Sequence, residues 1–323
     1  MTSSSGDGRG SVVARGLFRK FGAYTAVEGL NFEVQAGEVF GLLGPNGAGK
    51  TTTVRMLTGL LEPSGGEAEV CGERIPLHGE GTALRKKVGL LTEQPGLYDR
   101  LSARENLSFF IRLHELDRLE AWKLAQHYLD RFGLKGREDE PVGGFSKGMR
   151  QKLAIVRTLV HRPQVLFLDE PTSGLDPESA RTVRDAVAEL AAEGRTLLLC
   201  SHNLAEVERL CTRVAVIKNR LRKVASLKEL RREGLSLEVH LGSDAAAFEA
   251  AVKALPFAPG TMSEGSRLRV MLSNEEEAPA VVEALVKAGA RVHQVTHAAR
   301  PLEEAYLELV REDDGNGAGS PGQ

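Results

Sequence analysis

One segment near the N-terminus constrains the fold of this chain more than any other. A short apolar run, Val39–Leu43, leads directly into Gly44-Pro45-Asn46-Gly47-Ala48-Gly49-Lys50-Thr51, which fits the pattern G-x-x-x-x-G-K-[S/T]. Glycines allow successive backbone N–H groups to turn toward an anion without a side chain in the way. The apolar residues Val54, Leu57 and Leu61 follow at helical spacing, so they can pack on a sheet. The segment therefore predicts a strand, a phosphate-binding loop and a helix. A chance match in a chain of this length has a probability of about one in a hundred.

The loop residues predict specific contacts with a nucleotide and a metal ion. The segment Gly44 to Thr52, through its backbone N–H groups at every position except Pro45 and through the positive end of the helix, would bind the phosphates. Lys50 would reach the β- and γ-phosphates, and the Thr51 hydroxyl would ligate Mg²⁺.

Two further apolar runs each end in residues that can do chemistry. Val165–Leu168 is followed by Asp169 and Glu170, and Leu197–Cys200 is followed by Ser201 and His202. Continuous apolar runs are typical of strands buried in a parallel sheet, and such sheets bind ligands beyond the carboxyl ends of their strands. Asp169 could hold Mg²⁺, and Glu170 could polarise a water for attack on the γ-phosphate. His202 could hydrogen-bond the γ-phosphate and sense its loss.

Length and composition limit the class of protein. A chain of 323 residues usually folds as more than one unit, and 41% hydrophobic with 27% charged residues is a globular balance. The formal net charge of −2 argues against a dedicated nucleic-acid binder. The scattered cysteines Cys71, Cys200 and Cys211 lack metal-ligand spacing and indicate reduced cytosolic thiols.

No apolar run approaches the roughly 20 residues of a membrane helix, and the first ten residues lack the apolar core of a signal peptide. We therefore expect a chain that is neither membrane-spanning nor secreted. If it energises transport, another polypeptide must form the pathway.

Alternating strand and helix patterns indicate two domains between flexible tails. The tails are expected at residues 1–10 and 312–323. An α/β domain is expected over 11–226, with a helical insert at about 95–160. A small α+β domain of ferredoxin-like type is expected over 227–311. Its predicted elements are strands at 235–241, 267–272 and 292–296 and helices at 245–255, 278–288 and 302–311.

With Phe145-Ser146-Lys147-Gly148-Met149, which precedes a predicted helix, the motifs together resemble the ATP-binding cassette of exporter-type ABC transporters. The five residues look like the family signature, most often written LSGGQ, and the resemblance spans about 12–224. It implies a P-loop ATPase fold that uses ATP and Mg²⁺. It also implies that two cassettes close head-to-tail, with the signature of one completing the ATP site of the other; a homodimer is favoured over a heterodimer.

The resemblance also implies roles for other residues. Ser173-Gly174-Leu175-Asp176 looks like the D-loop at the dimer interface, and His202 matches the switch histidine. Phe21 matches the aromatic that stacks on adenine, with a simple core aromatic as the alternative. Pro301-Leu302-Glu303-Glu304-Ala305-Tyr306 looks like a motif of the accessory domain found in many exporter-type ATPases.

The chain departs from the family pattern after the predicted strand Val88–Leu91. The family places a glutamine there that contacts Mg²⁺ and the attacking water. Counting back from Leu97-Tyr98 puts Glu93 at that position, with Gln94 one residue further on. Pro95 restricts Gln94 to an extended conformation, which favours Glu93 without excluding Gln94.

These features predict an ATPase subunit that energises a separate transmembrane permease for export, on the inner face of the membrane. The alternative is a non-transport ABC ATPase that remodels a soluble macromolecular partner. A regulatory module without turnover is disfavoured because Lys50, Asp169, Glu170 and His202 are all intact.

Overall fold

The computed structural model describes residues 11–75, 81–232, 235–258, 260–299 and 302–311, and the two predicted tails lie outside these ranges. The chain divides into two compact units, Met1–Val224 and Ala225–Gln323. Each unit has its own hydrophobic core.

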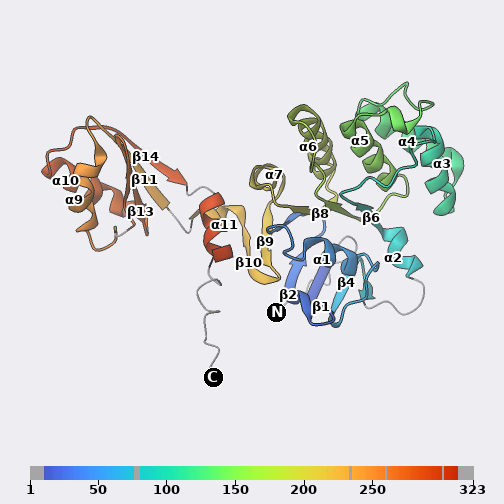
Figure 1. Ribbon diagram of the computed structural model, residues 1–323, viewed down its shortest axis with the longest axis horizontal. Helices are drawn as coiled ribbons and strands as arrows, with labels where there is room; N and C mark the ends of the chain where they lie inside the picture. The colour runs from blue at the N-terminus through green and yellow to red at the C-terminus, as the bar shows by residue number, and fades with distance from the viewer. Residues whose placement is uncertain (1–10, 76–80, 233–234, 259, 300–301, 312–323) are drawn as a thin grey trace, which may run out of the picture. The chain divides into compact units, whose positions relative to one another are not determined.

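In the described part of the first unit, a ten-stranded sheet forms the centre (Figure 1). Its strand order is β5-β4-β1-β2-β10-β9-β3-β8-β7-β6. The strands are β1 (Val12–Phe21), β2 (Tyr24–Val34), β3 (Val39–Leu43), β4 (Gly65–Val70), β5 (Glu73–Ile75), β6 (Val88–Leu91), β7 (Val165–Asp169), β8 (Thr196–Ser201), β9 (Arg213–Lys218) and β10 (Arg220–Ser226).

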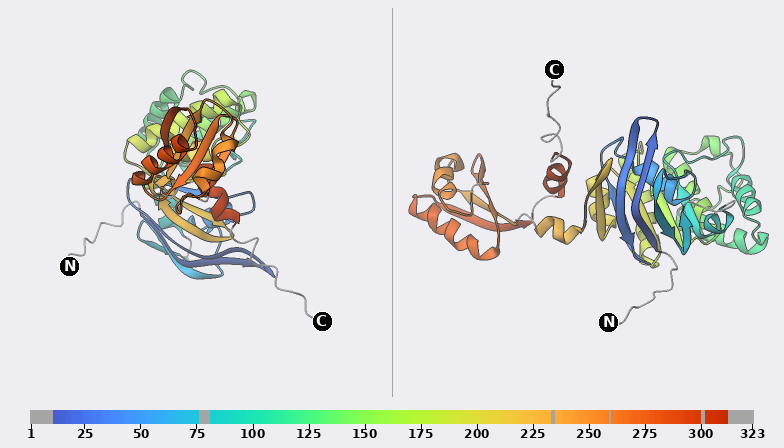
Figure 2. Two further views of the ribbon diagram at one scale, coloured as in Figure 1. Left: turned by 90° about the vertical axis from the view of Figure 1, so that its left-hand side faces the viewer. Right: turned by 90° about the horizontal axis from the view of Figure 1, so that it is seen from below.

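Two kinds of strand pairing meet in this sheet. Strands β9, β3, β8, β7 and β6 pair in parallel, and every residue of β3, β7 and β8 is buried. The three predicted apolar runs are therefore central strands covered on both faces. Strands β1, β2, β4 and β5 pair antiparallel, and Figure 2 shows the long β1 and β2 side by side. Because β3, β7 and β8 are parallel neighbours, their carboxyl ends meet at one edge of the sheet.

Five of the helices described in the first unit begin at a residue whose side chain caps them, whereas α1 and α2 begin after a glycine. The side chains of Ser102, Asp117, Ser146, Asp176 and Asn203 each accept a backbone N–H at the start of a helix. The helices are α1 (Lys50–Leu57), α2 (Thr82–Lys87), α3 (Ala103–Leu113), α4 (Arg118–Arg131), α5 (Lys147–Leu159), α6 (Pro177–Ala192) and α7 (Leu204–Leu210), with a 3-10 turn η1 (Val142–Gly144). Helices α3 to α5 occupy the predicted insert between β6 and β7 and gather together in Figure 1.

The second unit contains a four-stranded antiparallel sheet of order β12-β13-β11-β14. Helices α9 and α10 cover one face of it, where Leu237, Val239, Val252 and Val281 are fully buried (Figure 1). Its elements are α8 (Leu227–Arg232), β11 (Leu235–Leu241), η2 (Ala245–Phe248), α9 (Glu249–Lys253), β12 (Met262–Glu264), β13 (Arg267–Leu272), η3 (Glu275–Glu277), α10 (Ala278–Lys287), β14 (Val292–Ala299) and α11 (Leu302–Arg311).

The chain order β11-α9-β12-β13-α10-β14 in this sheet is the ferredoxin-like arrangement that the sequence predicted. Two details differ. Strand β12 was not predicted, because three residues are too few to show a strand pattern. The helix predicted at 245–255 is a 3-10 turn followed by a short α-helix, because Asp244 accepts the Ala246 N–H and starts the segment as a tight turn.

In the described part of the chain, none of the helices combines the length and the apolar character needed to cross a bilayer. The thiols of Cys200 and Cys211 are buried, and burial raises the pKa of both.

Candidate active site

At two positions of the loop between β3 and α1, glycine is required because a Cβ would meet backbone of a neighbouring strand. Gly49 precedes α1 with φ 94°, and a Cβ there would lie 2.6 Å from the Ala26 carbonyl oxygen. A Cβ on Gly44 would lie 2.4 Å from the carbonyl oxygen of Ile217. Both contacts are with backbone, which cannot move aside as a flexible side chain can. The predicted phosphate-binding loop is therefore held tightly between β2 and β9.

Lys50, the first residue of α1, turns back over this loop. Its side chain is 6% exposed, and Nζ donates to the carbonyl oxygens of Gly44 at 2.7 Å and Pro45 at 3.2 Å. Nζ also lies 3.2 Å from Glu170 Oε1, an ion pair without hydrogen-bond alignment. These two backbone contacts fix the ammonium group beside the loop, at the point where phosphates would lie.

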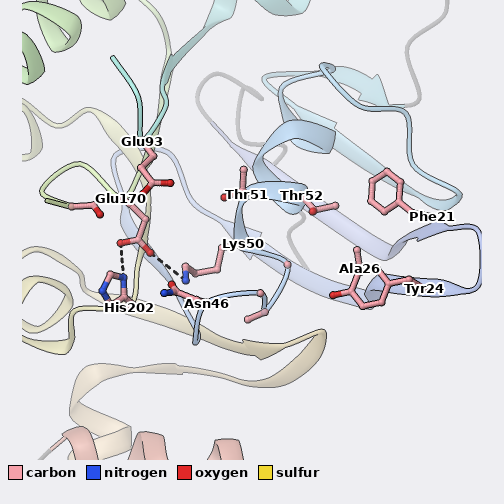
Figure 3. Close-up of a pocket in the computed structure, with 14 residues that line it drawn as sticks. Phe21, Tyr24, Ala26, Asn46, Lys50, Thr51, Thr52, Glu93, Glu170 and His202 are labelled. Carbon is pink, nitrogen blue, oxygen red and sulfur yellow. Dashed lines mark hydrogen bonds and ion pairs between the residues drawn. The ribbon is translucent and has the colours of Figure 1, made fainter. Parts of the chain in front are cut away.

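Glu170 lies just beyond β7, between two cationic or polar partners. Its Oε1 faces Lys50, and its Oε2 lies 2.8 Å from His202 Nδ1 beyond the end of β8 (Figure 3). Glu170 has φ 50°, a left-handed conformation that is uncommon for a residue other than glycine. Its N–H donates to the Cys200 carbonyl oxygen at 2.9 Å, which helps to hold this conformation. Strain of this kind costs about 1–3 kcal/mol and clusters at functional sites.

Asp169, the last residue of β7, has the properties of a metal ligand. It is 3% exposed, and its Oδ1 has no hydrogen-bond partner in the described part of the chain. Burial raises the pKa of Asp169, the nearby Glu170 and Glu93 carboxylates add to that effect, and Thr51 and Lys50 oppose it. A buried carboxylate oxygen without a partner is costly, and a cation would remove that cost.

The residues present fit Mg²⁺ in particular. Mg²⁺ is usually held by one or two protein oxygens and completes its shell with phosphates and water. Asp169 and Thr51 supply oxygens of this kind beside the phosphate-binding loop.

A cavity of about 460 Å³ brings most of the predicted residues together (Figure 3). It is lined by Phe21, Tyr24, Ala26, Asn46, Gly47, Ala48, Gly49, Lys50, Thr51, Thr52, Glu93, Glu170, Ser173 and His202. Gly44 and Pro45 do not line the cavity, and their carbonyl oxygens accept from Lys50 Nζ. Glu93 lines it and Gln94 does not; the Gln94 carbonyl instead accepts the Thr92 hydroxyl at 2.6 Å.

Two aromatic side chains stand at the end of the cavity opposite Glu170 and His202 (Figure 3). Phe21 is 44% exposed, which excludes the alternative of a core aromatic. Its partner Tyr24 is 57% exposed and pairs with it across the turn between β1 and β2. Sequence analysis missed Tyr24; its place three residues after Phe21 on a short turn was the only available indication.

The signature and D-loop residues largely lie outside the cavity. Ser146 is exposed and accepts the Met149 N–H at 3.2 Å, as expected of a helix cap. A Cβ on Gly148 would lie 2.7 Å from Ser179, so this glycine lets α5 pack closely on the start of α6. Asp176 caps α6, and only Ser173 of the predicted D-loop lines the cavity. None of the five signature residues, Phe145 to Met149, lines the cavity of its own chain.

The parallel sheet, the glycine loop and the acidic strand ends define a P-loop nucleotide-binding protein. The sequence pattern described as "ABC transporter" matches residues 27–173. The daunorubicin resistance ATP-binding protein DrrA3 of Streptomyces coeruleorubidus is 37% identical over 308 residues, covering 94% of this chain and 96% of that protein. The Nod factor export ATP-binding protein I of Ralstonia nicotianae is 42% identical over 213 residues, covering 66% of this chain and 65% of that protein.

A solved ATP binding subunit of an ABC transporter superposes with a TM-score of 0.62 at 31% identity, covering 69% of this chain and 92% of that one. The chain belongs to the ABC transporter family, as one of its ATP-binding subunits. ATP hydrolysis is the general activity of such subunits, which work with transmembrane permeases.

Proposed function

We propose that the cavity at the carboxyl ends of β3, β7 and β8 hydrolyses ATP, with Glu170 as the base. The observation that supports this most is the place of the Glu170 carboxylate, 3.2 Å from Lys50 Nζ and 2.8 Å from His202 Nδ1. Such contacts orient a carboxylate toward the phosphate-binding loop, where a general base must lie to meet the attacking water.

In this proposal each polar side chain has a defined role. A water oxygen bonds to the γ-phosphorus, the bond from that phosphorus to the bridging oxygen breaks, and ADP leaves. Glu170 takes the proton from the water. Lys50 stabilises the negative charge on the β- and γ-phosphates, and His202 hydrogen-bonds the γ-phosphate.

Asp169 and Thr51 would hold Mg²⁺, with Glu93, which lines the cavity, as the favoured further ligand over Gln94, which does not. When bound, Mg²⁺ neutralises charge on the phosphate oxygens. Phe21 and Tyr24 would hold the adenine, because exposed aromatic rings at the far end of the cavity offer flat faces for stacking.

We further propose that two copies of this chain close over two nucleotides, with Ser146–Met149 and the D-loop at the interface. The exposed Ser146 and its absence from its own cavity support a shared site. A mixing experiment tests this. Ser146→Arg and Lys50→Ala proteins, each inactive alone, should together form dimers with one intact composite site. Random assortment would restore roughly a quarter of the wild-type rate. Mixed dimers that form without regaining activity would contradict a shared site.

The transport role is proposed as export of a drug-like, small or lipid-like molecule through a separate permease. The names of the daunorubicin resistance and Nod factor export relatives support this class. The chain would then act in the cytoplasm, on the inner face of the membrane through its permease. Residues 11–226 would form the cassette, and residues 227–311 an accessory domain that supports dimerisation or coupling.

Reconstitution tests the transport role. The chain should bind a six-helix membrane protein encoded beside it, and in proteoliposomes that protein should raise its ATPase rate. Binding only to a soluble macromolecule, with no effect of the membrane protein on ATP turnover, would support the remodelling alternative instead.

A further inference from the structure

Glu206 is a buried carboxylate to which the roles above assign nothing. It lies in α7 and is 1% exposed. Burial raises its pKa, and the nearby Glu170 carboxylate adds to that effect. A carboxyl group in the interior is costly unless its oxygens are hydrogen-bonded, so its partners indicate what it does.

Each carboxyl oxygen of Glu206 accepts a hydrogen bond from a hydroxyl on a different chain segment. The Thr172 hydroxyl donates to Oε1 at 3.1 Å, and the Ser201 hydroxyl donates to Oε2 at 2.7 Å. Thr172 stands two residues after Glu170, and Ser201 stands directly before His202. The Glu206 side chain thus bridges the two chain segments that carry the Glu170–His202 pair.

The bridge is itself held in place at its base. Ser201 Oγ also accepts the Asn203 N–H at 3.0 Å, and Asn203 Oδ1 accepts the Glu206 N–H at 3.3 Å. These bonds tie the first turn of α7 to the end of β8. Because Glu170 adopts a left-handed conformation, its loop needs such outside support to stay in one geometry.

We propose that Glu206 is a positioning residue that fixes Glu170 relative to His202 and thereby sets the rate of ATP cleavage. This inference depends on the proposed catalytic role of Glu170. Other contacts hold Lys50 and the glycine loop in place: Lys50 Nζ donates to the Gly44 and Pro45 carbonyl oxygens, and Gly49 lies against β2. Loss of the bridge should therefore slow hydrolysis and leave nucleotide binding nearly unchanged.

Three variants of the full chain test this. Glu206→Ala should lower kcat at least about tenfold, because displacements of about 1 Å at a catalytic group cost up to about a hundredfold. Its KM for MgATP should change by less than about threefold, because MgATP binding depends on the phosphate-binding loop and Lys50, which have their own supporting contacts. Glu206→Gln should restore most of kcat, because both hydroxyls can accept as well as donate. Thr172→Val removes one bond at constant volume and should lower kcat by a smaller factor with the same KM.

Val207→Ala is the matched control, since Val207 is fully buried on the same helix and its side chain packs toward Gly41 of β3. It should lower the melting temperature and leave kcat per folded molecule unchanged at low temperature. A wild-type kcat in both Glu206→Ala and Thr172→Val would overturn the proposal, as would equal losses of kcat in Glu206→Ala, Glu206→Gln and Val207→Ala.

If Glu206→Ala fails to fold, the kcat values of Thr172→Val and Glu206→Gln test the proposal in its place. Glu170→Gln, assayed in parallel, separates the proposed catalytic role of Glu170 from the proposed positioning role of Glu206. An active Glu170→Gln would remove Glu170 as the base. An inactive Glu170→Gln beside fully active Glu206 and Thr172 variants would overturn the positioning role alone.

Discussion

Replacing single glycines of the phosphate-binding loop by alanine should separate backbone strain from steric clash. Gly47 and Gly49 both have positive φ, 81° and 94°. A Cβ at Gly47 meets nothing within 4 Å, whereas a Cβ at Gly49 meets the Ala26 carbonyl oxygen at 2.6 Å. A left-handed alanine costs about 1–2 kcal/mol. The clash should add about 1–3 kcal/mol, as overpacking does elsewhere. Gly47→Ala should thus lose about 1–2 kcal/mol of folding free energy and Gly49→Ala about 2–5 kcal/mol.

Urea unfolding followed by tryptophan fluorescence measures this difference. The chain has one tryptophan, Trp122, in α4 of the first unit, so the signal reports that unit alone. The slopes of free energy against urea must agree among the proteins for midpoints to be compared. Equal losses of stability in Gly47→Ala and Gly49→Ala, or a larger loss in Gly47→Ala, would refute the steric argument.

Three further outcomes are expected. Burial lowers the pKa of His161 to about 4 from the usual 6.5, so between these values the unfolded chain takes up a proton that the folded chain does not. The free energy of unfolding should therefore fall as pH drops through this window. Urea titrations should show a shallower fall in His161→Gln than in the wild-type chain, and an identical dependence of unfolding free energy on pH in both proteins would contradict this. Glu93→Gln should preserve hydrolysis and change its Mg²⁺ dependence only modestly, and Gln94→Ala should be nearly silent. The assignment of Glu93 to the family's glutamine position is wrong if Gln94→Ala abolishes ATP turnover and Glu93→Ala does nothing. A chain ending at Ser226, where β10 ends, should bind MgATP with near-normal affinity by calorimetry; a folded cassette unable to bind it would argue against independent units.

Local pattern was sufficient to predict the elements whose residues are buried on all sides. Strand β3 begins and ends at the predicted residues, because a continuous apolar run between charged and glycine-rich segments has few other folds available. The order of the motifs then places the loop, the acidic strand end and His202 at one sheet edge. No structure was needed for that step, since parallel neighbours share their carboxyl ends.

Features that depend on contacts distant in sequence could not be predicted in this way. Glu206 looks like an ordinary solvated charge on a short helix, and its burial and its hydrogen bond to Thr172, 34 residues away, appear only in the folded chain. Tyr24 reaches the cavity because β1 and β2 pair across a tight turn. The close approach of Gly148 to Ser179 likewise arises from the crossing of two helices.

The central claim, that Glu170 is the base at this cavity, is tested most directly by comparing hydrolysis with binding in Glu170→Gln. Phosphate release should fall at least about a hundredfold, because a carboxamide cannot take the proton from the attacking water. The affinity for MgATP, measured by calorimetry on the same protein, should stay within a few-fold of wild type, and ATP-dependent dimers should accumulate. Lys50→Ala, by contrast, should weaken binding itself, since it removes a charge aimed at the phosphates. Near-normal phosphate release by Glu170→Gln would contradict the account.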